Sequence, residues 1–96
     1  MKRDQLDQIR QQIDAVDKQL LKLLNERAQF VLDLGRVKFA EGLKLFDPER
    51  ERFIFEHVTT GNQGPLSREA VTRLFERIID ESRRLERTEV YDKAEE

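Results

Sequence analysis

The sequence predicts an all-α protein, and three observations support that fold class. Apolar residues recur at helical spacing from Leu6 to Val37, and no proline or glycine interrupts them before Gly35. Two later segments show the same helical spacing, and each follows a residue that commonly caps a helix. No segment shows the alternation of apolar and polar residues that is typical of a strand. Hydrophobic residues make up 38% of the 96 residues, so apolar side chains must lie along narrow stripes. We expect one domain over residues 1–96.

The first expected helix covers about residues 4–40 and carries two apolar heptad lines. One line comprises Ile9, Val16, Leu23, Phe30 and Val37, and the other comprises Leu6, Ile13, Leu20, Arg27 and Leu34. Such a helix spans about 55 Å at about 1.5 Å per residue, which exceeds the width of a compact domain of this size. The remaining residues are too few to cover both lines. We therefore expect a second copy of the chain to cover them.

Two shorter helices are expected at about 48–60 and 68–90. The long helix should end near Gly42, after which Asp47 can cap the second helix and Pro48 suits its first position. A turn-like stretch follows at 60–65, and Ser67 is expected to cap the third helix. The polar tail over residues 91–96 is expected to be frayed.

Charge and composition exclude several classes of function. The 18 basic and 20 acidic residues are interleaved and give a net charge of −2, so no single-sign field favours nucleic acid or an anionic membrane. The chain has no cysteine and one histidine, which leaves neither a disulfide scaffold nor a cysteine or histidine metal site. The N-terminus is too polar for a signal peptide, and no apolar run approaches membrane-spanning length. We expect a cytoplasmic protein without metal or cofactor.

Arg27 stands in a heptad line whose other members are apolar, and a buried unpaired guanidinium is costly. It could pair with a carboxylate of the same protein, extend to the surface or bind an anionic ligand. Lys38 lies about three turns after Arg27 and only about 20° round the helix, so two cations share nearly the same face. This favours an anionic ligand as the partner of Arg27. Arg10 lies about 25 Å from Arg27 and about 42 Å from Lys38 along the helix, and it points roughly 80 to 100° away from both. It is either a surface residue or reaches the site of an antiparallel partner.

Three charged residues open the second expected helix. All three can be explained without a ligand. Asp47 can serve as the N-cap, Glu51 lies near the favourable end of the helix dipole, and Arg50 can lie on the surface. Alone, this cluster does not identify a site.

Ser82 and Glu86 are one turn apart and continue the apolar stripe of the third expected helix. Both would then face the core, unless this stretch is solvated as the neighbouring Arg83, Arg84 and Arg87 suggest. A buried glutamate must pair with a cation or keep its proton. We therefore expect Glu86 either to meet one of the cations or to be protonated.

Six motifs occur in a specific order and spacing. They are LDQIR at 6–10, IDAVD at 13–17, LLKLLNER at 20–27, GRVK at 35–38, FDPERE at 46–51 and LFERIIDES at 74–82. Together they resemble the all-helical, bacterial-like type II chorismate mutases over about residues 5–87. The resemblance implies an intertwined homodimer of three-helix chains whose long helices pair. It also implies two equivalent sites that rearrange chorismate to prephenate in phenylalanine and tyrosine biosynthesis, without metal or cofactor.

The resemblance further implies how the substrate is bound. Arg27 and the partner subunit's Arg10 would bind the two carboxylates of chorismate, Arg50 would support a carboxylate, and Ser82 would contact the substrate. Arginine suits this task because its planar fork grips a carboxylate with two hydrogen bonds.

The remaining roles implied by the resemblance concern the ether oxygen and the hydroxyl of chorismate. Lys38 and Glu86 would donate to the ether oxygen from opposite sides, and Asp47 and Glu51 would meet the hydroxyl. Many bacterial members have glutamine where this chain has Glu86, and a glutamine amide donates at any pH. A carboxylate donates only when protonated, so the activity is expected to fall as pH rises.

Other functions remain possible on the same scaffold. An isochorismate-pyruvate lyase would use similar cations on an isomeric substrate. A regulatory domain of a longer shikimate-pathway enzyme would share the fold, and a helical dimer that binds only protein would leave the cleft of Arg27 and Lys38 without a ligand.

Overall fold

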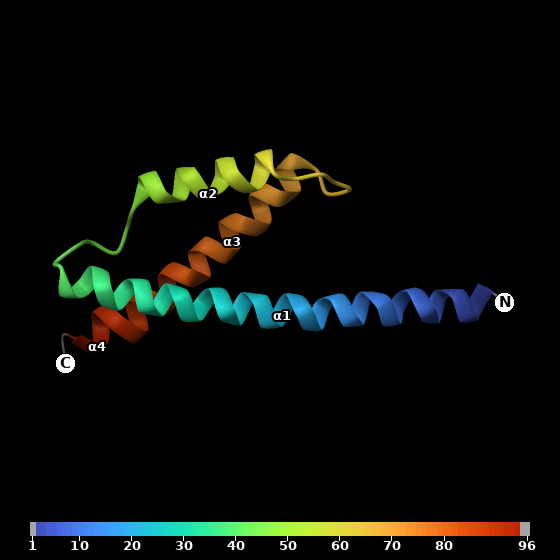
Figure 1. Cartoon of the computed structure of the whole chain (residues 1–96), viewed down its shortest axis with the longest axis horizontal. Coiled ribbons are helices and arrows are strands. Elements are labelled where there is room, and N and C mark those ends of the chain that lie inside the picture. The colour runs from blue at the N-terminus through green and yellow to red at the C-terminus, as the bar shows by residue number, and fades with distance from the viewer. Residues whose placement is uncertain (1, 95–96) are drawn as a thin grey trace. The chain divides into compact units, whose positions relative to one another are not determined.

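The computed structural model describes residues 2–94, and all its regular elements are helical (Figure 1). In chain order they are α1 (Lys2–Ala40), α2 (Pro48–Thr60), α3 (Arg68–Glu86), the π-helix η1 (Arg87–Tyr91) and α4 (Asp92–Ala94). The predicted all-α class with three main helices is confirmed. None of these helices combines the length and apolar character needed to cross a membrane. The chain divides into two compact units, Met1–Phe30 and Val31–Glu96.

The first unit consists of the N-terminal part of α1, and its apolar side chains are exposed in the single chain. Both heptad lines are affected: Ile9 is 56% exposed, Ile13 is 53% exposed and Phe30 is 73% exposed. A continuous apolar stripe of this kind is unusual on the surface of a monomeric protein and marks an interaction surface.

The second unit begins with the last turns of α1, which end in a left-handed glycine. Gly42 has a φ of 74°, a conformation that costs glycine little because it has no Cβ. The amide of Leu43 donates to the carbonyl of Lys38 at 2.8 Å, and the amide of Gly42 donates to the carbonyl of Phe39 at 3.1 Å. This is the hydrogen-bond pattern of a Schellman cap. The predicted end of the helix near Gly42 is confirmed.

Helices α2 and α3 begin at the predicted caps and pack against one another. Asp47 Oδ1 accepts the amide of Arg50 at 3.1 Å, and Ser67 Oγ accepts the amide of Ala70 at 3.0 Å. Among the described residues, the buried apolar side chains of this unit are Val71, Ile79 and Val90. This is a small core for a domain of this length, and many large apolar side chains of the single chain stay exposed.

The C-terminal segment differs from the prediction. A single helix to residue 90 and a frayed tail were expected, but α3 ends at Glu86 and a π-helical turn carries the chain into α4. The Tyr91 hydroxyl donates to the carbonyl of Leu43 at 2.8 Å, and its ring meets Phe39 edge-on at 5.3 Å. These contacts hold the segment beside the end of α1 (Figure 1). The prediction of a frayed tail rested on its polar composition and gave no weight to Tyr91, which anchors it. Residues 95 and 96 lie outside the described part of the chain.

Candidate active site

A buried ion pair joins the end of α1 to the end of α3. Lys38 Nζ lies 2.9 Å from Glu86 Oε2, and the two side chains are only 13% and 7% exposed. The expectation that Glu86 faces the core is confirmed, and it meets a cation. Removing two charges from water is expensive, so a buried pair is weak evidence for a stabilising role. Charged groups held in this way cluster at functional sites.

Gly35 allows the carboxylate of Glu86 to approach α1 so closely. It is the buried glycine of α1, one turn before Lys38. A Cβ at this position would lie 2.6 Å from Glu86 Cγ and 3.3 Å from Glu86 Oε2. The absent side chain therefore creates the space that Glu86 occupies.

The loop between α1 and α2 supplies the second partner of Lys38. Lys38 Nζ donates to the carbonyl of Leu45 at 2.7 Å as well as to Glu86. The same loop accepts the Tyr91 hydroxyl at Leu43, so the C-terminal segment helps to fix its path. An ammonium group has three N–H donors. Within the described part of the chain, two of the three donors of Lys38 are engaged, and one remains for a ligand.

An open cleft of about 750 Å³ is lined in part by Lys38. Its lining comprises Leu34, Lys38, Leu43, Lys44, Phe46, Asp47, Pro48, Glu49 and Arg50. This volume is typical of sites for small organic molecules, and the lining combines apolar walls with cations and carboxylates. Three of the predicted site residues, Lys38, Asp47 and Arg50, therefore lie around one cleft.

The charged residues at the start of α2 have defined partners. Asp47 caps the helix, as the sequence predicted, and the guanidinium of Arg50 lies 5.1 Å from the centre of the Phe53 ring. Glu51 Oε1 is 3.2 Å from Arg83 Nη2 on α3. Glu51 therefore pairs with a cation on α3, in addition to its predicted position near the favourable end of the helix dipole.

Arg83 was not among the predicted site residues and was named only with the alternative of a solvated stretch. Its side chain is 32% exposed, pairs with Glu51 and lies over the Phe46 ring at 5.1 Å. Helical spacing could have revealed it, because Arg83 follows the buried Ile79 by one turn and precedes the buried Glu86 by one turn.

The other predicted site residues are distributed between the two units. Ser82 is half-buried on α3, and its hydroxyl donates to the carbonyl of Ile78 at 2.7 Å. Arg10 is exposed and Arg27 is half-buried, and both lie on α1 in the first unit. Their contacts with a substrate remain predictions.

Similarity to known proteins identifies the family. Residues 9–87 match the family described as chorismate mutase type II. The chain belongs to the chorismate mutase type II family. Over 88 residues it is 40% identical to a bifunctional chorismate mutase/prephenate dehydratase of Pseudomonas aeruginosa, with 86% of this chain and 24% of that protein covered. It thus spans about a quarter of the length of this bifunctional relative.

Two further relatives are named as chorismate mutases. One, from Methanocaldococcus jannaschii, is 36% identical over 55 residues, with 57% of this chain and 56% of that protein covered. The other is the solved structure of a chorismate mutase (form II) from Thermus thermophilus. It superposes with a TM-score of 0.87 at 32% identity, covering 90% of this chain and 98% of that chain.

The chorismate mutase type II match includes every predicted site residue, from Arg10 to Glu86. It also includes Gly35 and Arg83, but it ends before Tyr91. The anchoring of the loop by Tyr91 therefore lies outside the matched segment.

Proposed function

We propose that this chain rearranges chorismate to prephenate, a step towards phenylalanine and tyrosine. The buried Lys38–Glu86 pair beside the cleft carries the proposal, because it places a cation with an available donor in a largely dehydrated position. Membership of the chorismate mutase type II family supports chorismate as the substrate. The proposal concerns the domain in hand, whatever else a longer protein contains.

The rearrangement breaks one C–O bond and forms one C–C bond in a concerted step, so it needs no nucleophile. Catalysis can come from holding the compact reactive conformer and from donors placed where negative charge grows on the ether oxygen. Lys38 would supply such a donor, because its third N–H is not engaged in the described part of the chain. Leu45 and Glu86 fix the ammonium group in advance, which reduces reorganisation during the reaction.

The protonation of Glu86 would control this donor. An ionised Glu86 cannot donate to the ether oxygen, and it also competes with that oxygen for the protons of Lys38. A protonated Glu86 can donate, and it leaves the positive charge of Lys38 uncompensated for the transition state. Both effects make the protonated carboxyl group the form that favours catalysis in this proposal.

The carboxylates of chorismate would be bound by arginines. We assign one to Arg27 and one to Arg10 of the partner subunit, with Arg50 supporting a carboxylate from the cleft wall. Asp47 and Glu51 would meet the hydroxyl of the substrate. Ser82 would contact the substrate.

A homodimer is part of the same proposal. The exposed heptad lines of the first unit need a cover, and a second copy offers an identical apolar stripe. The buried apolar side chains of the described residues are few, so burial of these lines would add most of the core. Sedimentation at micromolar concentration should give twice the monomer mass of 11.4 kDa, and a monomer with full activity would refute the shared site.

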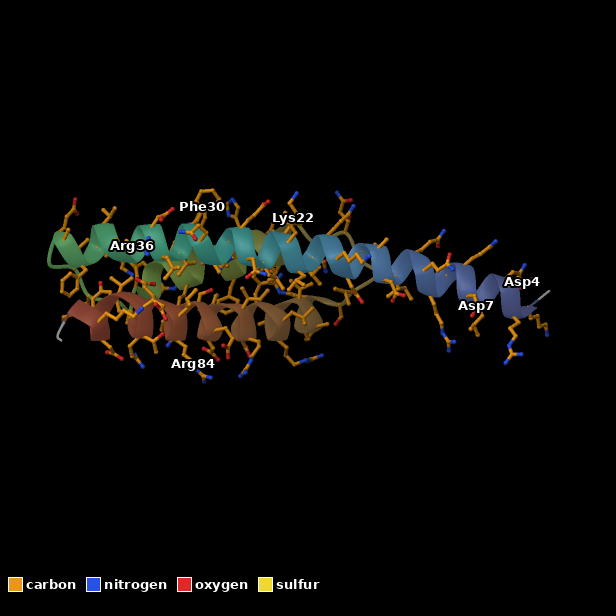
Figure 2. All side chains as sticks on the ribbon, turned by 90° about the horizontal axis from the view of Figure 1, so that it is seen from below. Asp4, Asp7, Lys22, Phe30, Arg36 and Arg84 are labelled. Carbon is orange, nitrogen blue, oxygen red and sulfur yellow. The ribbon has the colours of Figure 1, made fainter. Side chains whose placement is uncertain are left out.

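The decisive measurement is the loss of chorismate absorbance with purified protein. Lys38→Ala should lower kcat by about 100- to 1000-fold, as removal of a preorganised donor typically does. The matched control is Lys22→Ala, an exposed lysine on α1 (Figure 2), which should leave kcat unchanged. Full turnover by Lys38→Ala would refute the mechanism. Preferential cleavage of isochorismate to pyruvate would instead identify a lyase.

A further inference from the structure

Arg83 connects α3 to two features of the cleft region. Its Nη2 lies 3.2 Å from Glu51 Oε1 on α2 and 3.4 Å from Asp80 Oδ1 on its own helix. Its guanidinium lies over the ring of Phe46, and that ring also lines the cleft. One side chain therefore contacts both an apolar wall of the cleft and a carboxylate at the start of α2.

Stability does not explain why an arginine occupies this position. Arg83 Nε is buried and has no hydrogen-bond partner among the described residues. A buried donor without a partner costs free energy, and replacing both members of a buried ion pair by apolar side chains is often neutral or stabilising. A methionine of similar length would keep the packing over Phe46 without that cost.

We infer that Arg83 is a positioning residue that holds the carboxylate of Glu51 towards the hydroxyl of the substrate. The inference rests on the proposed function, in which Glu51 meets that hydroxyl. Arg83 engages Oε1, and Oε2 of the same carboxylate remains available as an acceptor. The contact also limits the rotamers of Glu51, so less freedom is lost when the substrate binds.

The kinetic signature of this role is specific. A hydroxyl contact is present in both the bound substrate and the transition state, so its loss weakens binding without slowing the chemical step. Arg83→Met should therefore raise KM about two- to twelvefold with little change in kcat, because the side chain of Glu51 must then be ordered when the substrate binds. Arg83→Met also leaves the carboxylate of Glu51 without its cation, so the melting temperature of this variant should fall. The Glu51→Gln background separates this effect from positioning, because it leaves no unpaired carboxylate.

The experiment compares Arg83→Met with Arg84→Met in the full chain. Arg84 is adjacent on α3, but its side chain is 68% exposed and points outward (Figure 2), where it pairs with Glu81. The control should keep the KM and kcat of the original chain. In a Glu51→Gln background, Arg83→Met should raise KM by less than about twofold, because the carboxylate that it positions has been removed.

The outcomes separate this inference from the proposed function. If the original chain is active and Arg83→Met matches Arg84→Met, the inference is wrong while the proposed function stands. A full rise in KM that persists in the Glu51→Gln background would show that Arg83 does not act through Glu51. A chain that leaves chorismate unchanged would refute the proposed function, and with it the role given to Arg83.

Discussion

Replacing Gly35 by alanine tests whether the side chain of Glu86 must pack directly against the backbone of α1. The new methyl carbon would lie 2.6 Å from Glu86 Cγ, whereas carbon atoms in contact are about 3.5–4.0 Å apart. The overlap is about 1 Å, and overpacking of this kind costs about 1–3 kcal/mol. Alanine also favours the helix over glycine by about 1 kcal/mol. We expect a net loss of about 0–2 kcal/mol in the free energy of unfolding.

The clash can be isolated by repeating the substitution without the glutamate side chain. In a Glu86→Ala background the methyl group of Gly35→Ala meets no Cγ, so only the helix preference remains and the protein should gain about 1 kcal/mol. The coupling between the two positions is then about 1–3 kcal/mol. If the unpaired lysine prevents folding, Lys38→Met combined with Glu86→Ala supplies the background.

Urea unfolding followed by circular dichroism, at one fixed protein concentration, measures both effects. The turnover of Gly35→Ala should also fall, because the displaced carboxyl group can no longer donate to the ether oxygen from its position beside Lys38. An equal gain in stability in both backgrounds would mean that Glu86 does not occupy the space above Gly35, and the geometry of the proposed site would be wrong.

Three further predictions follow from the same contacts. Glu86→Gln should keep or raise the kcat of the original chain, since an amide can donate to the ether oxygen; a large loss of kcat would argue against a donor at this position. Mixing inactive Arg10→Ala and Lys38→Ala chains in equal amounts should restore about a quarter of full activity, because about half of the dimers are mixed and each mixed dimer has one intact site of two. No recovery after subunit exchange would contradict a site shared between subunits. Tyr91→Phe should lower the free energy of unfolding by about 0.5–1.5 kcal/mol through the lost bond to Leu43, as measured in urea; unchanged stability would show that this hydrogen bond contributes nothing.

Local signals determined the helices and part of the site. The caps at Asp47 and Ser67 and the end of α1 at Gly42 depend on side chains and backbone within a few residues, so they could be predicted from short segments. The burial of Glu86 followed from helical periodicity, because it continues the stripe that the apolar residues of α3 form.

Only the tertiary structure decided which partners these residues meet. The contact of Lys38 with Glu86 joins positions 48 residues apart, and Tyr91 meets Leu43 across the same separation. The pairing of Arg83 with Glu51 spans 32 residues. Periodicity shows which face of a helix is buried but not which side chain of another helix lies opposite, because that depends on how the helices cross and on where a glycine lets them approach. The sequence thus determined the helices and the buried glutamate, while their packing decided the partner of each charge.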